Sequence, residues 1–260
     1  IGTTWHSRST MTGLDPFTYG LFKSADAGST FTQITSVNNG SQVDEINDLE
    51  IQKIGSLNRL WLSTTDSQYW SGIDGGRFWY SDDGTSFTRA NPTFPVFPTT
   101  SPTTRHRTEI APSQTDTDTH YVLIQTSSTS SSTVDFPMIP IIYKTVDNFS
   151  TFTYVTPPVD ADLGIPNFDF TRGQSFYDLE IEVDPTNEDI LYVGGIDWFR
   201  SQNGGTSWSQ ITKWAPFNAN LNTLNVSVVH ADQHGLYFKP GDTNKAIVVN
   251  DGGVAYSSSL

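Results

Sequence analysis

An eight-residue pattern recurs along this chain of 260 residues, and its spacing limits the folds that the chain can adopt. The pattern reads Ser or Thr, any residue, Asp or Asn, three variable residues, Ser or Thr, and an aromatic residue; in the second copy Tyr80 takes the first position. The copies span residues 24–31, 80–87, 145–152 and 201–208, so they begin 56, 65 and 56 residues apart. Such a repeat indicates similar supersecondary units that stack against one another.

A second repeating element lies upstream of the eight-residue pattern. Residues 181–195 match residues 236–253, a third copy begins at Ile110, and a degraded copy runs from Ile51 to Leu62. Each copy reads as a strand, a turn with Pro, Asn or Asp, and a second strand. With a short aromatic strand before the pattern and a strand after it, each repeat has four antiparallel strands, and no stretch has convincing helical periodicity. The sequence therefore predicts an all-β fold, a β-propeller of four-stranded antiparallel blades.

The two ends of the chain occupy the same place in the repeat. Leu21–Lys23 and Val254–Tyr256 are both the strand that precedes the pattern, so the ends duplicate each other instead of completing one blade. A fifth copy of the pattern is expected near Ser257 or Ser258, where the end of the sequence interrupts it. We therefore expect residues 1–260 to form one region of about four blades, a segment of a larger propeller.

Each copy of the pattern is expected to form a tight turn, called a box turn below. The Asp or Asn side chain can accept hydrogen bonds from nearby backbone N–H groups, and Gly permits a positive φ angle where the chain reverses. The terminal aromatic side chain is expected to enter the blade core and anchor the turn. The side chains predicted to be structural in this way are Ser24, Asp26, Gly28, Thr30, Phe31, Asp82, Gly84, Ser86, Phe87, Thr145, Asp147, Thr151, Phe152, Ser201, Asn203, Gly205, Ser207 and Trp208.

This repeat resembles that of the Asp-box (BNR repeat) β-propellers, a family that includes sialidases, sortilin-like receptors, xyloglucan-cleaving glycoside hydrolases and a photosystem II assembly factor. The resemblance covers nearly the whole chain. It implies a propeller whose boxes lie at the blade periphery and are structural. The resemblance therefore argues against reading Asp26, Asp82 or Asp147 as catalytic acids, and it leaves the function open because one fold hosts many functions.

Charge and composition exclude several classes of function. The chain has 14 Lys and Arg against 28 Asp and Glu, a formal net charge of −14, which disfavours binding to nucleic acid or to anionic lipid. It has no cysteine, which excludes disulfides, thiol catalysis and Cys-ligated zinc. No apolar run approaches the roughly 20 residues that span a bilayer. With only 16% charged residues and many Ser, Thr, Trp and Tyr, the composition favours an extracellular protein, and the absence of cysteine favours a bacterial one.

A row of polar side chains near the C-terminus is the strongest candidate for chemistry. On a strand, His230, Asp232 and His234 would share one face, because residues two apart point the same way. Two imidazoles and a carboxylate could hold a metal ion such as zinc, contact a ligand, act as an acid–base pair, or form a structural hydrogen-bonded row. This string, followed by Asn-Asp-Gly-Gly-Val at residues 250–254, looks like that of the xyloglucan-cleaving type.

Glycoside hydrolysis needs two carboxylates about 5–10 Å apart across a groove. The sequence places several aspartates near strand ends but cannot pair them, and each is also explained as a turn residue. Asp232 and Asp251 are the weak catalytic candidates. The full set is Asp74, Asp178, Asp197, Asp232 and Asp251.

Three aromatic side chains fall outside the repeat. Tyr69, Trp70 and Trp214 lie in segments rich in Gly, Ser and Thr or flanked by Pro, which read as loops. Because binding residues concentrate on loops, these three are candidates to stack on a ligand or contact a partner.

These features predict a secreted or cell-surface propeller that binds a glycan or a surface protein without catalysis, as a bacterial adhesin does. One alternative is a glycoside hydrolase of the xyloglucan-cleaving propeller type. A second alternative is a scaffold or assembly subunit of a larger surface complex. We expect no cofactor, no nucleic-acid partner and no insertion into a membrane.

Overall fold

The computed structural model describes residues 20–38, 45–65, 76–90, 104–127, 139–215 and 220–260. These residues form β-strands, turns and irregular segments, with no helix among them. The described part of the chain accordingly contains no helix that could cross a lipid bilayer. The prediction of an all-β fold is confirmed.

The strands of the described residues form six sheets, of which four are antiparallel blades that follow the chain order. Blade 1 contains β3 (Glu45–Ile54), β4 (Leu57–Thr65), β5 (Phe78–Ser81) and β6 (Thr88–Ala90). Blade 2 contains β7 (Thr104–Pro112), β8 (His120–Ser127), β9 (Ile139–Thr145) and β10 (Thr153–Val155). Blade 3 contains β11 (Glu180–Asp184), β12 (Asn187–Gly194), β13 (Trp198–Ser201) and β14 (Ser209–Gln210), and blade 4 contains β17 (Gln233–Lys239), β18 (Asp242–Asn250) and β19 (Gly253–Ser257).

Two smaller sheets complete the described structure. The leading hairpin, β1 (Phe22–Lys23) and β2 (Thr32–Gln33), precedes blade 1 and encloses the first box turn. Between blades 3 and 4, β15 (Thr212–Lys213) and β16 (Ser227–Val228) form a short parallel pair.

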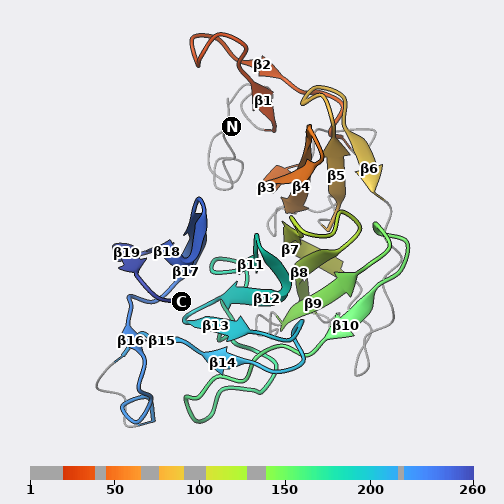
Figure 1. Ribbon diagram of the computed structural model, residues 1–260. Helices are drawn as coiled ribbons and strands as arrows, with labels where there is room; N and C mark the ends of the chain where they lie inside the picture. The colour runs from red at the N-terminus through yellow and green to blue at the C-terminus, as the bar shows by residue number, and fades with distance from the viewer. Residues whose placement is uncertain (1–19, 39–44, 66–75, 91–103, 128–138, 216–219) are drawn as a thin grey trace, which may run out of the picture.

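The blades are arranged around a common centre, as in a β-propeller (Figure 1). Their first strands, β3, β7, β11 and β17, lie innermost, and β6, β10 and β14 lie outermost. Apolar side chains fill the space between neighbouring blades, so that each blade buries one face against the preceding sheet. The cores are dominated by large side chains such as Trp61, Tyr121 and Trp198, all fully buried. The predicted architecture of antiparallel propeller blades is confirmed.

Three of the box turns share one hydrogen-bond pattern. In the first, the Ser24 hydroxyl accepts the Gly28 N–H and Asp26 Oδ1 accepts the Thr30 N–H, each at 2.8 Å. The hydroxyl and N–H of Thr30 lower the pKa of Asp26 to about 2. The turns in blades 2 and 3 repeat both bonds, with Asn203 in place of the aspartate in blade 3. The polar side chains of these turns therefore bond within the turn, as their chemistry predicts.

The box turn of blade 1 begins one residue later than the sequence alignment predicts, at Ser81 instead of Tyr80. Asp83, not Asp82, is its central acceptor: Asp83 Oδ1 accepts the N–H groups of the two residues after Gly84, each at 2.7 Å. Ser81, the last residue of β5, takes the first position, and its hydroxyl accepts the Gly84 N–H at 2.9 Å. Asp82 instead forms an ion pair with Arg59 at 2.7 Å. The alignment was wrong because this turn is one residue shorter and has one left-handed residue, Gly84, where the others have two.

Substitution of these two adjacent aspartates is expected to have unequal effects. Asp83→Ala removes the acceptor for two backbone N–H groups of the turn, whereas Asp82→Ala removes an ion pair at the surface, which contributes about 0–1 kcal/mol. We expect Asp83→Ala to lower the midpoint of thermal unfolding more than Asp82→Ala, measured by tryptophan fluorescence. An equal or larger loss for Asp82→Ala would show that Asp82 is the central residue of this turn.

The aromatic anchors pack against the preceding repeat, and this explains why Phe31, in the first box turn, is exposed. Phe87 and Phe152 are buried in the clusters that join blade 1 to the leading hairpin and blade 2 to blade 1. Trp208 packs against the core between blades 2 and 3, and its Nε1 donates to the Thr156 carbonyl at 2.8 Å. The prediction that Phe31 enters a core is wrong: its side chain is 57% exposed, because no described sheet precedes the leading hairpin.

Candidate functional site

Five polar side chains meet where the inner strands of blades 3 and 4 begin. Tyr177 and Asp178 lie in the segment just before Leu179 and β11. Asp232 precedes β17, His234 is its second residue, and Asp251 lies in the turn between β18 and β19. Because β17 and β18 are antiparallel, the start of one meets the end of the other. We call these five residues the end cluster.

The centre of the end cluster is the carboxylate of Asp251. Its Oδ1 lies 2.7 Å from His234 Nε2 and accepts the Tyr177 hydroxyl at 2.9 Å. The ring centroids of Tyr177 and His234 lie 4.9 Å apart in an edge-to-face arrangement. The hydrogen bond with His234 and that from Tyr177 lower the pKa of Asp251, so its side chain is held as a carboxylate.

The expectation that His230, Asp232 and His234 share one face of a strand is wrong, because of the backbone conformation of Asp232. The strand β17 begins only at Gln233, and Asp232 has a φ of 63°, a left-handed conformation that interrupts the alternation. The Asp232 carbonyl accepts the Asp251 N–H at 3.3 Å. Burial and the neighbouring Asp251 carboxylate raise the pKa of Asp232. The turn at Asp232 thus places Asp232 and His234 beside Asp251. Alternation along a strand does not predict this arrangement, because Asp232 lies outside β17.

His230 lies at the edge of this group. It is exposed, and its Nδ1 is 3.0 Å from the neighbouring Ala231 carbonyl oxygen. Its ring covers Gly252, where an added Cβ would lie 2.5 Å from His230 Cγ. The described residues contain no group of three or more His, Asp or Glu side chains placed to hold a metal ion, so the weak metal candidates His230, Asp232 and His234 do not form such a site there.

Asp178 is the buried member of the end cluster. Its side chain is 0% exposed, and neither carboxylate oxygen has a hydrogen-bond partner. Burial, and next the charge of Asp232, raise the pKa of Asp178 to about 9, against an opposing effect of Arg107. Asp178 is therefore protonated at neutral pH, and it is less accessible than Asp232.

After burial, the neighbouring Asp251 carboxylate is the next cause that raises the pKa of Asp232. Of two carboxyl groups that share a site, one has its pKa raised by the charge of the other. Hydrolysis of a glycosidic bond instead requires carboxyl groups separated by about 5–10 Å, with the sugar between them. The end cluster offers hydrogen-bond donors and acceptors to a ligand.

The remaining sequence candidates fall elsewhere. Asp197 is buried in a separate cluster, 4.0 Å from Arg172, where burial and the charge of Asp160 raise the pKa of Asp197 to about 7. Trp214 is 42% exposed, with the Arg172 guanidinium 5.8 Å from its ring centroid. Three candidates, Tyr69, Trp70 and Asp74, lie outside the described residues.

An acidic group on the inner strands was not singled out from the sequence. Asp48 and Glu50 on β3, Glu109 on β7, and Glu180 and Glu182 on β11 interact electrostatically with one another, and burial raises the pKa of each. Arg107 is the positive charge among them: it bonds to Glu109 at 2.9 Å and lies 3.4 Å from Glu180. The available signal was the spacing of acidic residues two apart in strands β3 and β11, which places both members on one face.

Comparisons with known proteins support the fold. No protein-family model matches the chain, and no curated protein matches it. Among solved structures, the chain is similar to an α-L-arabinanase from Penicillium chrysogenum, with a TM-score of 0.52, 12% identity, and coverage of 92% of this chain and 67% of the arabinanase. This chain is a β-propeller.

Two further solved structures have a similar arrangement. An α-L-arabinofuranosidase from Fusarium graminearum gives a TM-score of 0.50 at 11% identity, with 91% of this chain and 65% of the enzyme covered. The GH74 xyloglucanase from Xanthomonas campestris gives a TM-score of 0.46 at 11% identity, with 92% of this chain covered. The chain spans only 38% of that xyloglucanase. At these identities the likeness concerns the fold alone.

Proposed function

We propose that this chain belongs to a secreted or cell-surface β-propeller that binds a glycan at the end cluster without cleaving it. The observation that carries the proposal is the convergence of Tyr177, Asp232, His234 and Asp251 from separate segments onto one site. Carboxylates, imidazole and a phenol ring supply the acceptors, donors and aromatic surface that suit sugar hydroxyls and sugar faces. The Asp-box resemblance and the composition, low in charged residues and rich in Ser, Thr, Trp and Tyr, support the extracellular setting.

The charge of the end cluster favours a neutral or amine-bearing glycan. Three carboxyl groups, those of Asp178, Asp232 and Asp251, lie together, while the guanidinium of Arg107, which acts on Asp178, is engaged by Glu109. A uronic or sialic acid would place its negative charge beside the ionised Asp251 carboxylate. Recognition of such acids ordinarily relies on arginine in a bidentate contact, which the end cluster does not offer.

Removing one hydroxyl from the end cluster is expected to weaken glycan binding. Tyr177→Phe keeps the ring and deletes the donor to Asp251, and we expect affinity for a responsive neutral polysaccharide to fall about three- to tenfold, since one hydrogen bond contributes about 0.5–1.5 kcal/mol. The measurement is isothermal titration calorimetry against a panel of soluble polysaccharides. Tyr237→Phe, an exposed tyrosine on blade 4, is the matched control. Equal affinity of the Tyr177→Phe variant and the unsubstituted chain would contradict the proposal.

Glycoside hydrolysis is the second candidate, favoured by the opposite pKa shifts of Asp232 and Asp251. Such a split is how enzymes assign an acid and a base to two like groups. Chromatography of polysaccharide digests separates the two functions. Release of oligosaccharide that stops in both Asp232→Asn and Asp251→Asn variants would establish hydrolysis and overturn the non-catalytic proposal.

A further inference from the structure

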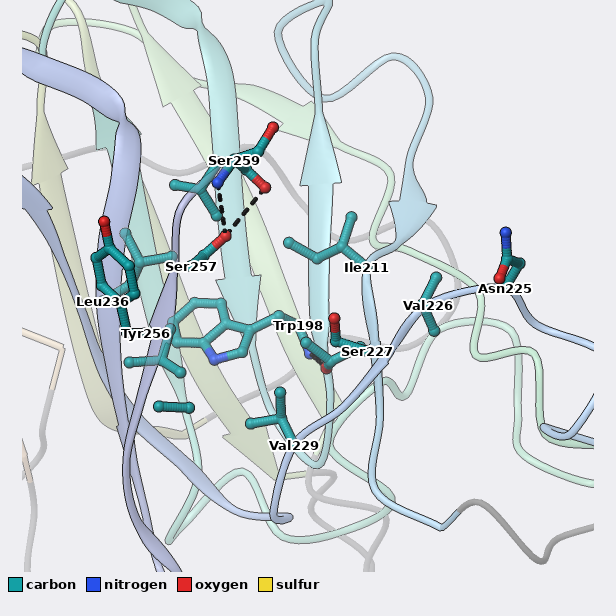
Figure 2. A pocket seen from close by; sticks show the side chains of 14 residues that line it. Trp198, Ile211, Asn225, Val226, Ser227, Val229, Leu236, Tyr256, Ser257 and Ser259 are labelled. Carbon is teal, nitrogen blue, oxygen red and sulfur yellow. Dashed lines mark hydrogen bonds between the residues drawn. The ribbon is translucent and has the colours of Figure 1, made fainter.

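Trp214 is an exposed aromatic side chain that stands outside the end cluster and directly after β15. The chain that leads to it runs along a cavity of about 540 Å³ between blades 3 and 4, whose lining includes Ile211 (Figure 2). Thr212 and Lys213 are buried, whereas 42% of the Trp214 side chain is exposed. The chain therefore presents its indole outward immediately after two buried residues.

The two buried residues hold the backbone before Trp214 in place. The Thr212 hydroxyl donates to Asp197 Oδ1 at 3.2 Å. The Lys213 ammonium donates to the Leu224 carbonyl at 2.6 Å. An aromatic side chain on a fixed backbone loses little conformational freedom when a ligand covers it, so more of the contact energy remains as affinity.

Arg172 supports the indole from one side. Its guanidinium lies 5.8 Å from the Trp214 ring centroid, and a cation placed over a ring is attracted by the π electrons. Asp160 binds the same guanidinium at 2.8 Å and 3.0 Å, and Asp162 binds it at 2.9 Å. The Asn220 amide donates to Asp162 at 3.0 Å. We call Trp214, Arg172, Asp162 and Asn220 the indole site.

The turn between β12 and β13 joins the indole site to the end cluster. It contains Asp197, which accepts the hydroxyl two residues before Trp214. The Gln233 N–H donates to the Gly195 carbonyl of this turn at 2.9 Å, and the Gln233 side-chain amide donates to the Ile196 carbonyl at 3.1 Å. Gln233 stands between two members of the end cluster in the sequence. The two sites therefore lie at the same end of blades 3 and 4.

A left-handed residue occurs in each of the two sites. Five non-glycine residues of the described chain have a positive φ, and three of them lie in box turns. The other two are Arg172, with a φ of 52°, and Asp232 of the end cluster, with a φ of 63°. Such conformations cost energy and concentrate at sites that bind ligands. The backbone outside the box turns is thus strained at these two sites.

We propose that the indole site is a second contact for the glycan bound at the end cluster, with a sugar residue of the same chain stacked on Trp214. This inference rests on the proposed glycan-binding function and extends its site from blade 4 towards blade 3. The C–H groups of a sugar face pack on an aromatic ring, and Asp162 and Asn220 supply an acceptor and a donor for sugar hydroxyls. Two contacts on one chain raise affinity, because the second forms at a high effective concentration.

The side chains that hold the indole favour a sugar over a protein surface. Arg172, Asp162 and Asn220 are charged or polar, whereas the buried centre of a protein interface is depleted of charged residues. Leu163 follows Asp162 in the sequence and is 78% exposed. A protein docked on this loop would cover Leu163, and a sugar stacked on Trp214 does not require it.

The test compares long and short glycans. The probes are soluble xyloglucan, arabinoxylan and galactomannan, with the disaccharides cellobiose, xylobiose and mannobiose, measured by isothermal titration calorimetry. We expect Trp214→Ala to lower affinity for a polysaccharide about tenfold and to leave affinity for its disaccharide unchanged. Trp214→Phe keeps an aromatic face and is expected to retain most of the affinity. Tyr177→Phe is expected to weaken binding of both the long and the short probe.

Fluorescence provides a direct readout of stacking. Addition of the polysaccharide is expected to change tryptophan emission in the unsubstituted chain and to leave it unchanged in Trp214→Phe. Two variants are controls that are expected to bind as the unsubstituted chain does. Phe31→Ala removes an exposed aromatic ring from the first box turn, and Leu163→Ser removes the exposed apolar side chain beside Asp162.

The possible outcomes separate this inference from the proposed function. Unchanged polysaccharide affinity in Trp214→Ala, with binding still weakened in Tyr177→Phe, would overturn the inference and leave the proposed function standing. Loss in Trp214→Ala alone would keep the indole contact and reject the end cluster as the binding site. Equal losses in Trp214→Ala and Leu163→Ser, or loss of disaccharide binding in Trp214→Ala, would overturn the inference. Absence of binding by every probe would overturn both.

Discussion

Gly205→Ala is expected to destabilise the chain by about 3 kcal/mol or more, the largest effect of an added methyl group at any glycine for which the structure describes the surroundings. An added Cβ would lie 2.2 Å from Cγ1 of Val155, and Gly205 has a φ of 83°, which alanine adopts only under strain. The box turn of blade 3 approaches blade 2 this closely because its anchor must reach the core between the two blades. The urea midpoint of unfolding, followed by tryptophan fluorescence, measures the loss.

Gly28→Ala is the matched control, since Gly28 occupies the same position in the first box turn. Its φ is 90°, but no atom lies within 4 Å of an added Cβ, so only the backbone strain of about 1–2 kcal/mol remains. The double variant Val155→Ala with Gly205→Ala is expected to cost less than the sum of its single variants, because it removes the clash. Equal losses for the two glycines would show that box turns do not pack on the preceding blade.

Raising the pH from about 5 to about 9 is expected to lower the stability of the chain strongly. Burial raises the pKa of the inner-strand carboxyl groups, to about 7 for Glu50, and raises that of Asp178 to about 9. Between the ordinary carboxyl pKa near 4 and these raised values, the folded chain holds protons that the unfolded chain has released. The free energy of unfolding therefore falls as the pH rises through this interval. Thermal unfolding in a series of buffers measures it.

Glu182→Gln is expected to stabilise the chain by about 1–2 kcal/mol at pH 8 and to have little effect near pH 4, since removing one of several like charges relieves repulsion only where they ionise. Burial and the charge of Glu50 are the main causes that raise the pKa of Glu182. Asp118→Asn, which removes an exposed carboxylate, is the control and should leave the pH profile unchanged. A Glu182→Gln variant that is destabilised at pH 8 would show that its carboxylate has a favourable partner in the folded chain.

The periodicity of the box turns was sufficient to predict the fold, because each turn satisfies its own hydrogen bonds with residues four positions apart. Ser24 and Asp26, or Ser201 and Asn203, carry that chemistry within one local segment. Local alignment failed at Asp82 because one residue is missing from the turn of blade 1, and both neighbouring positions are aspartate. Only the hydrogen bonds to Thr85 and Ser86 distinguish Asp83 as the acceptor.

The candidate site was predicted in part. The string that contains Asp232 and His234, and the later Asp251, were recognised as unusual, but strand alternation was the wrong rule for them. The left-handed Asp232 turns the chain before β17 begins, and the β18–β19 turn then presents Asp251 to His234. The sequence could not assign Tyr177 to this site, because Tyr177 is 74 residues from Asp251 in the sequence and belongs to another blade.

The sequence by itself determined the strands, the repeat and the chemistry within each turn, because these depend on side chains a few residues apart. The tertiary structure alone decided which repeats cover one another: Phe87 and Phe152 are buried by a preceding sheet while Phe31 is exposed. It also decided that acidic residues of three inner strands share one region and that Tyr177 and Asp251, from different blades, meet. Those properties arise from contacts between blades, and the distance between blades is not encoded in any local spacing.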